Sequence, residues 1–209
     1  MSKALCCLSF ETLHNKLFNK TSSISLDEFE SVLPSEEKLP LKAPLFVTLE
    51  KRGNLRGCIG TFQSLPLESG VRRFTYSSAF QDPRFSPVDK KELEDLEVSV
   101  TLLNKFESVK LWDDWEVGKH GLKISIGQDG DFLGTFLPNV APEQGWDAET
   151  TLWYLLRKAD YTGILKSKTT EFYQKGIEEG WIDLQRYEGL KAELSYKDFL
   201  RYKQSIDRD

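Results

Sequence analysis

The sequence predicts an α+β fold, built from mostly antiparallel sheets with flanking helices. Two observations predict it: strand-like segments occur in pairs joined by turn residues, and amphipathic helical segments stand between the pairs. The order of hairpin, helix and strand occurs twice, which also predicts an internal duplication. With 39% hydrophobic and 29% charged residues in 209, the chain is typical of a globular protein that buries a sizeable core.

Residues 4–18 are predicted to form the first helix, because Cys6, Phe10, Leu13 and Leu17 lie on one apolar stripe. We therefore expect Cys6 to be a packed core thiol. Palmitoylation of the adjacent cysteine pair is the alternative, and stable anchoring by that route requires a second signal.

The first copy of the repeat consists of a hairpin, a helix and a strand. A short helix over 26–33 and a proline-containing loop precede it. Its hairpin is predicted to turn at Gly53 and Asn54, residue types that favour tight turns. Its elements are the strands 45–50 and 55–62, the helix 67–80 and the strand 97–103.

The second copy has the same order of elements. Its hairpin is predicted to turn at Asp129 and Gly130, and Asp147 is placed to cap its helix. Both second strands contain Gly-Thr-Phe, at 60–62 and 134–136. Its elements are the strands 122–126 and 132–137, the helix after Asp147 and a strand near 181–187.

The tail is predicted to add a strand near 190–194 and a final helix. Ser195 is expected to begin this helix, because its hydroxyl and the carboxylate of Asp198 form a capping pattern. These two elements complete the predicted fold.

The charge balance argues against several classes of function. The formal net charge is -5 and the isoelectric point is about 5.3, so the chain lacks the basic character of proteins that bind nucleic acid or anionic membranes. It contains no apolar run long enough to span a bilayer, and its start lacks the cleavage pattern of a signal peptide. We expect no membrane association.

The cysteines indicate the compartment. Cys6, Cys7 and Cys58 are an odd number with two adjacent members, which makes a poor disulfide framework. We therefore expect a reducing compartment, either cytoplasmic or nuclear. The chain has no zinc-type spacing, no glycine-rich phosphate loop and no serine–histidine–aspartate order, so neither a metal nor a cofactor is expected.

The most informative segment is LRGCIGTF at 55–62, which places an arginine, a thiol and two glycines in a predicted strand. Because glycine weakens a strand, Gly57 and Gly60 indicate that something approaches this backbone closely. Alternation puts Arg56 and Cys58 on one face, where the cation would favour the thiolate and a nucleophilic role. The alternative is a buried, inert cysteine.

His120 is the second candidate catalytic residue beside Cys58. It stands between two glycines at a predicted turn before the strand 122–126. Either it is poised near neutral pH to act as a base, or its ring is hydrogen-bonded to nearby backbone.

Arg84 and Glu97 also belong to the predicted binding set. Asp82 precedes a proline and is expected to close a turn. Arg84 is expected to anchor an anion or to pair with an acidic group across the fold. Glu97 shares a strand face with Ser99, and it would pair with Arg56 if their two strands lie side by side.

Glu143 and Trp146 precede the predicted cap at Asp147. They either offer polar and aromatic groups to an anion at the helix N-terminus, or Trp146 acts as a hydrophobic staple to the first helical turn.

The same segments carry a family resemblance. LRGCIGTF resembles the signature of the AMMECR family, and the departures downstream are small: Asn139 stands where a glutamine is expected, and Asp160-Tyr161 where a glycine-containing pair is common. Nearly the whole chain takes part. The segments that resemble the family's successive blocks, in the same order, are AFQDPRFSP at 79–87, DLEVSVTLL at 95–103, DWEVGKHGLKI at 114–124, FLPNVAPEQGWD at 136–147, LLRKADY at 155–161 and LQRYEGLKAELSYKDFL at 184–200.

The resemblance implies a single α+β domain with a larger and a smaller subdomain, at about 1–65 plus 120–209 and at about 66–119 respectively. Family members occur fused to or beside Memo-type and radical SAM proteins, which implies a shared pathway and a reaction on a nucleobase, nucleotide or similar small molecule. A role in nucleic-acid regulation is also suggested for the family, and the acidic charge of this chain counts against it.

Three functions therefore stay open. In the favoured one, a cleft around LRGCIGTF binds a small molecule or a protein partner without chemistry. In the second, the protein is a thiol-dependent enzyme, so Cys58→Ser would abolish function, whereas a binding module would tolerate it. In the third, the protein is a nucleic-acid-associated regulatory factor, whose affinity would fall steeply with salt.

Overall fold

The structure is a computed structural model that describes residues 3–21, 24–33, 38–127 and 130–206. Its strands are β1 (Lys42–Lys51), β2 (Asn54–Pro66), β3 (Leu96–Ser108), β4 (His120–Ile126), β5 (Phe132–Phe136) and β6 (Ile182–Ser195). Its helices are α1 (Ala4–Phe18), α2 (Leu26–Val32), α3 (Leu67–Phe80), α4 (Val140–Gln144), α5 (Ala148–Lys158), α6 (Thr169–Glu178) and α7 (Tyr196–Ile206), with short 3-10 helices η1 (Lys90–Asp95) and η2 (Lys166–Lys168).

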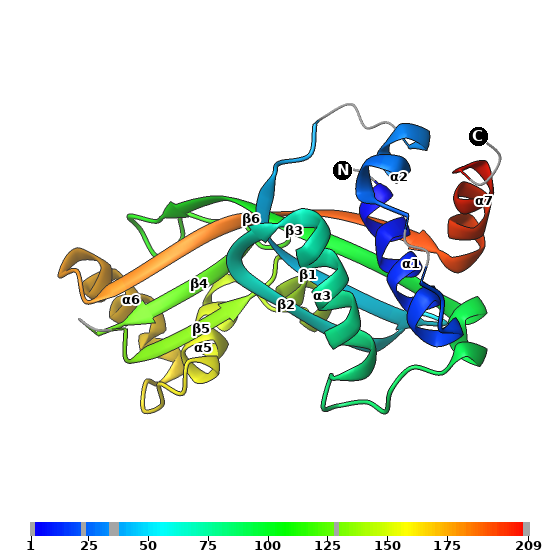
Figure 1. The fold of residues 1–209 in the computed structure, drawn as a ribbon. Helices are drawn as coiled ribbons and strands as arrows, with labels where there is room; N and C mark the ends of the chain where they lie inside the picture. The colour runs from blue at the N-terminus through cyan, green and yellow to red at the C-terminus, as the bar shows by residue number, and fades with distance from the viewer. Residues whose placement is uncertain (1–2, 22–23, 34–37, 128–129, 207–209) are drawn as a thin grey trace. The chain divides into compact units, whose positions relative to one another are not determined.

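The α+β prediction is confirmed, because within the described residues the strands form one six-stranded sheet in the order β2-β1-β3-β6-β4-β5 (Figure 1). The pairings of β1 with β2 and β3, and of β4 with β5 and β6, are antiparallel. None of the helices in the described part of the chain is long and apolar enough to cross a membrane.

The chain divides into two compact units. The first unit comprises residues 1–103 and 190–209, and the second comprises residues 104–189. β3 and β6 each run from one unit into the other. In this division residues 66–103 belong to the same unit as β1, because the Ser78 hydroxyl of α3 donates to β1 and β3 pairs with β1.

In the first unit, one face of β2-β1-β3 forms the core with α3 and α1, which lie side by side in Figure 1. Leu45, Val47 and Leu49 of β1 are fully buried there. Burying each such side chain contributes roughly 1.5–3 kcal/mol. The Ser78 hydroxyl of α3 donates to the carbonyl of Val47 at 2.8 Å and accepts from the N–H of Ile59 at 2.9 Å, which fixes the helix on two strands.

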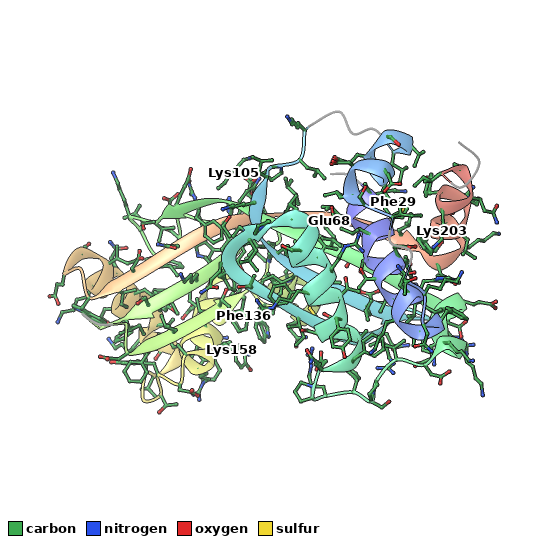
Figure 2. All side chains as sticks on the ribbon, viewed as in Figure 1. Phe29, Glu68, Lys105, Phe136, Lys158 and Lys203 are labelled. Carbon is green, nitrogen blue, oxygen red and sulfur yellow. The ribbon has the colours of Figure 1, made fainter. Side chains whose placement is uncertain are left out.

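The N- and C-terminal helices complete the first unit. Cys6 is completely buried on α1, and its thiol donates to the carbonyl of Ala192 at 3.3 Å, so the packed-thiol prediction is confirmed. Burial raises the pKa of Cys6 to about 12. Lys203 on α7, labelled in Figure 2, bonds the buried carboxylate of Glu11 on α1 at 2.5 Å, and this ion pair joins the two helices.

The predicted cap of the last helix is also confirmed. Ser195 Oγ accepts from the N–H of Asp198 at 3.2 Å, and the Asp198 carboxylate lies 3.0 Å from the same hydroxyl. The strands predicted near 181–187 and 190–194 are a single strand, β6, because Gly189 continues the extended backbone instead of ending it.

In the second unit, α5 and α6 pack on one face of β5-β4-β6. Ile124 of β4, Leu155 of α5 and Tyr173 of α6 are fully buried in this core. Asp147 caps α5 as predicted, because its carboxylate accepts from the N–H of Thr150 at 2.8 Å. Of the predicted turn at Asp129 and Gly130, Asp129 lies outside the described residues.

The two units repeat one topology. In each, a hairpin is followed by helical segments, α3 in the first unit and α4, α5 and α6 in the second, and the next strand pairs with the first strand of the hairpin. The shared Gly-Thr-Phe is nevertheless not an equivalent position. Gly134 faces α5, where an added Cβ would lie 3.0 Å from the carbonyl oxygen of Leu155, whereas Gly60 lies against the ring of Phe46 on the face away from α3.

Candidate functional site

Cys58 lies in one cross-strand row with two hydroxyl side chains, those of Thr48 and Ser99, on three neighbouring strands of the first unit. Thr48 on β1 is paired in register with Cys58 on β2 and with Ser99 on β3. Sγ of Cys58 and Oγ1 of Thr48 are 3.2 Å apart, within hydrogen-bond distance. Because successive side chains alternate, all three point away from the core side that carries Val47.

The same face continues with two glutamates, Glu50 on β1 and Glu97 on β3, which are paired in register. We call the five side chains of Thr48, Glu50, Cys58, Glu97 and Ser99 the polar face. Thr48, Glu50 and Cys58 are half-buried, and Ser99 is buried with 6% of its surface exposed. Sequence reasoning missed Thr48 and Glu50, although their alternation with buried Val47 and Leu49 was a usable signal.

The backbone of Cys58 is held by two side chains from the loop after α3. Its N–H donates to the carboxylate of Asp82 at 3.0 Å, and its carbonyl accepts from Arg84 Nη2 at 3.1 Å. Arg84 also donates to Asp82 through Nε at 2.9 Å and Nη2 at 2.7 Å. Because β2 is at the end of the strand order, this pair supplies the hydrogen bonds that a further strand would have made.

Asp82 closes its turn and also accepts a hydrogen bond from the backbone of Cys58. Arg84 pairs with Asp82, two residues before it in the sequence, rather than with an acidic group across the fold. The side chain of Asp82 is almost fully buried. The hydrogen bonds from Arg84, with those from the backbone of Cys58 and Arg84, hold the pKa of the Asp82 carboxyl well below its usual range.

Arg56 does not lie where simple alternation places it. Leu49 pairs with Gly57 and Glu50 pairs with Leu55, so Arg56 is the extra residue of a β-bulge. Bulges redirect side chains, and this one brings the guanidinium to Glu92, with bonds of 3.1 and 3.0 Å to the carboxylate.

The carboxylate of Glu92 is the counter-ion of Arg56. The hydrogen bonds from Arg56, with further ones from the backbone of Asp89 and from Lys51, lower the pKa of Glu92 to about 2. The conditional ion pair between Arg56 and Glu97 is not formed, because β1 lies between β2 and β3.

The thiol of Cys58 is not activated. Burial raises its pKa above the ordinary value, although the hydrogen bond with Thr48 and the charge of Arg84 act in the opposite direction. The cation that reaches this thiol is Arg84 rather than Arg56, and the charges of Asp82 and Glu50 oppose its effect. Ionisation of Cys58 is therefore disfavoured in this environment.

The two glycines of LRGCIGTF admit close neighbours, as predicted, and both neighbours belong to the chain itself. A Cβ at Gly57 would lie 2.1 Å from the carbonyl oxygen of Ser78, so this glycine lets the backbone of α3 approach β2. A Cβ at Gly60 would lie 2.3 Å from the ring of Phe46.

His120 belongs to the second unit, and its ring is bonded to nearby backbone. The N–H of Glu116 donates to Nδ1 at 2.9 Å, so Nδ1 carries no proton. Burial, with the charges of Lys119 and Arg186, lowers the pKa of His120 and favours the neutral ring. The bond at Nδ1 is the backbone contact that the second interpretation of this histidine expects.

The loop before α5 also lies in the second unit. Trp146 stacks on Tyr154 with ring centres 4.2 Å apart, and it contacts Phe136 at 5.6 Å. It packs on the second helical turn rather than on the first, where a hydrophobic staple would lie. The exposed carboxylate of Glu143 accepts from Asn139 Nδ2 at 2.7 Å.

The candidate residues are thus divided between the units. The first unit contains Cys58, Arg56, Gly57, Gly60, Arg84 and Glu97, whereas the second contains His120, Glu143 and Trp146. Across the described ranges, no group of three or more histidine, cysteine, aspartate or glutamate side chains is arranged to hold a metal ion.

Comparison with known proteins places this geometry in a family. The chain is 33% identical over 214 residues to Uncharacterized protein YOR289W of Saccharomyces cerevisiae, covering 90% of this chain and 83% of that protein. It is 36% identical to Uncharacterized protein At2g38710 of Arabidopsis thaliana, covering 76% and 74%, and 34% identical to a protein of Sulfolobus acidocaldarius, covering 73% and 68%.

The fold is similar to a solved structure, that of uncharacterized protein PH0010 from Pyrococcus horikoshii, with a TM-score of 0.65 at 24% identity, over 91% of this chain and 89% of that one. Residues 6–177, which include both units' candidate residues, match the family model described as AMMECR1. The chain therefore belongs to the AMMECR1 family.

Proposed function

We propose that the protein is a ligand-binding module whose site is the polar face around Cys58. The observation that carries this proposal is the row of one thiol and two hydroxyls, Cys58, Thr48 and Ser99, at one level of the sheet. Strands position side chains more rigidly than loops do, so such a row is a preorganised set of hydrogen-bonding groups.

The surroundings of Cys58 support rigidity. Asp82 and Arg84 hold its backbone, and Ser78 fixes the neighbouring residue Ile59 to α3. A site held in this way loses little conformational entropy when a ligand binds.

Binding without thiol chemistry is the better supported interpretation. A nucleophilic cysteine needs a depressed pKa or an adjacent base. The pKa of Cys58 is raised, and the side chain within hydrogen-bond distance of its sulfur is a threonine hydroxyl. The thiol contributes a polar, deformable contact in this proposal, and it forms no covalent intermediate.

A saturation-transfer NMR experiment tests the proposal. The full chain is mixed with polar metabolites extracted from cells, and we expect saturation to reach a small subset of them. The double variant Thr48→Val, Ser99→Ala removes both hydroxyls at nearly constant volume and is expected to lose this transfer. Thr162→Val, at an exposed position of the second unit, is the matched control and is expected to keep it.

Cys58→Ser distinguishes the binding module from the thiol enzyme. Serine keeps a hydrogen-bonding group of similar size, so we expect the same metabolites to bind. Metabolites that are converted by the wild type and left unchanged by Cys58→Ser would establish the enzyme instead. Saturation transfer that is equal in wild type and the hydroxyl-free variant would contradict the proposed site.

A further inference from the structure

Glu50 and Glu97 place two like charges directly opposite each other on neighbouring strands. Such a pair destabilises a sheet, and a cation between the two carboxylates would compensate it. Among the described residues, neither carboxylate has a lysine, arginine or histidine nitrogen within 4 Å, and neither has a hydrogen-bond donor. The like charges therefore face the same region without a direct counter-ion from the chain.

The two glutamates act electrostatically on one lysine, Lys191, but its ion pair is with a different acid, Glu193. Lys191 Nζ is 2.9 Å from the carboxylate of Glu193. Although burial lowers the pKa of Lys191, the bond to Glu193 and the charges of Glu193, Glu50 and Glu97 raise it. Three carboxylates and one ammonium leave an excess of negative charge at this end of the polar face.

Ser99 provides an independent observation. It is a polar side chain with only 6% of its surface exposed, two positions along β3 from Glu97 and on the same face. Within the ranges that the structure describes, its hydroxyl has no hydrogen-bond partner. Ser99 Oγ is not among the fully enclosed, unpartnered side-chain atoms of the described residues, so this hydroxyl is open at the polar face and can bond a ligand atom.

We infer that the polar face takes a cationic small molecule, such as a protonated amine, with Glu50 and Glu97 as its counter-charges and the Ser99 hydroxyl as a hydrogen-bonding partner. This inference rests on the proposed function and names the chemical class of its ligand. A cation between the two carboxylates would remove their repulsion, which the free protein retains.

The aromatic neighbours suggest a suitable probe. Phe46 continues the same face of β1 beyond Thr48, and its ring meets that of Phe62 edge-on with centres 5.5 Å apart. A ligand that combines a ring with an amine would therefore contact aromatic and acidic groups on one sheet surface.

Three probes with the same phenol ring separate charge from shape. Tyramine carries an ammonium, tyrosol is neutral, and 4-hydroxyphenylacetate carries a carboxylate. Each is titrated into the nitrogen-15-labelled full chain at low ionic strength, and dissociation constants are taken from amide shifts at Thr48, Glu50, Glu97 and Ser99. We expect tyramine to bind about tenfold more tightly than tyrosol, and the anion to bind most weakly.

The double variant Glu50→Gln, Glu97→Gln is expected to bind tyramine no more tightly than tyrosol. Glu94→Gln, at an exposed position of η1, is the control and should keep the preference. If the double variant does not fold, Glu97→Gln alone and the salt dependence of the wild type make the same test, since added salt should weaken only the charged probe.

Equal or tighter binding of tyrosol or 4-hydroxyphenylacetate would overturn the inference, as would a tyramine preference that survives the loss of both carboxylates or the absence of binding by all three probes. Because the proposed function is judged by metabolites that depend on the hydroxyls of Thr48 and Ser99, it can stand when this charge assignment fails.

Discussion

Asp82 and Arg84 act as a pair on the backbone of one residue, Cys58. The carboxylate of Asp82 accepts from backbone and guanidinium donors at once, and the guanidinium also reaches the Cys58 carbonyl. A buried carboxylate with this many donors is stabilised in its charged form. The pair therefore links the charge state of a loop residue to the position of the candidate site.

Removing the guanidinium should destabilise the protein and change its response to acid. We expect Arg84→Ala to lower the free energy of unfolding by about 1.5–3 kcal/mol, the usual value of a hydrogen bond to a charged group. Because the pKa of Asp82 is lower in the folded state, its contribution is present at neutral pH and is lost as the pH falls below about 5. Urea denaturation at several pH values measures both effects.

In Arg84→Ala the loss of stability on acidification should be smaller than in the wild type. Arg84→Lys is the control, because it keeps the charge without the two-pronged contact and should be intermediate. An unchanged acid response in Arg84→Ala would contradict the assigned role.

The reactivity of Cys58 should follow its raised pKa. We expect slow alkylation by iodoacetamide near pH 7 and a rate that still increases above pH 9, because the thiolate is the reacting species. Mass spectrometry of individual peptides separates Cys58 from Cys6 and Cys7, which are buried and serve as internal controls. A rate that reaches its plateau below pH 8 would instead indicate an activated thiol.

At the residue scale, the sequence identifies the important segment but not its contacts. Alternation correctly puts Glu97 and Ser99 on one face of their strand, and it fails at Arg56 because nothing in the sequence marks the bulge. The partners Glu92 and Asp82 come from the loop and 3-10 helix after α3, so they are found only once the chain is folded.

At the element scale, β2 and α3 form one packed assembly around Gly57. Their backbones approach so closely that a methyl group at Gly57 would lie 2.1 Å from the Ser78 carbonyl oxygen. The Ser78 hydroxyl bonds both β1 and β2 within the same contact. The strand that presents Cys58 is thus positioned by the helix behind it.

Gly57→Ala should therefore destabilise the protein by about 1–3 kcal/mol, because the helix must move away from the sheet. Gly70→Ala in α3 is the matched comparison. Its added Cβ would lie 2.9 Å from the end of the Leu45 side chain and in ordinary contact with Leu65 at 3.6 Å. Because alanine is favoured over glycine in a helix by about 1 kcal/mol, a small net change is expected. Thermal unfolding of both variants checks the contrast, which equal effects would refute.

Most elements are readable from the sequence because burial and local pattern agree. The helices at Ala4–Phe18 and Leu67–Phe80 have the predicted ends. α6 (Thr169–Glu178) was not predicted, since it has no side-chain cap and follows a short 3-10 helix. The first hairpin turns at Arg52 and Gly53, one residue before the predicted turn at Gly53 and Asn54. Both turn residues have positive φ, and Lys51 pairs with Asn54 on either side of them.

At the scale of the whole molecule, the two units have separate hydrophobic cores. One core gathers side chains of α1, α2, α3, α7 and the first strands, and the other gathers those of β4, α5 and α6. Separate cores allow local opening of one unit with less effect on the other. The boundary between the two units depends on which side chains pack together, and the order of helices and strands in the sequence does not indicate it.

Leu155→Ala tests this independence. Leu155 is fully buried in the second unit, and its truncation should cost about 2–5 kcal/mol there. Hydrogen exchange should then increase in β4 and α5 more than in α1 and α3. Val71→Ala in the first unit is the reciprocal control, and equal exchange in both units for either variant would indicate a single cooperative unit.

The path of β3 and β6 has a consequence for how this chain can be rebuilt. The second unit is entered along β3 and left along β6, which are neighbours in the strand order. The segment 104–189 therefore leaves the first unit on one strand and returns to it on the neighbouring strand, as the chain of an inserted domain does. We therefore expect that the segment 104–189 can be exchanged, in evolution or by protein engineering, while the strands that carry Cys58, Thr48 and Ser99 are kept.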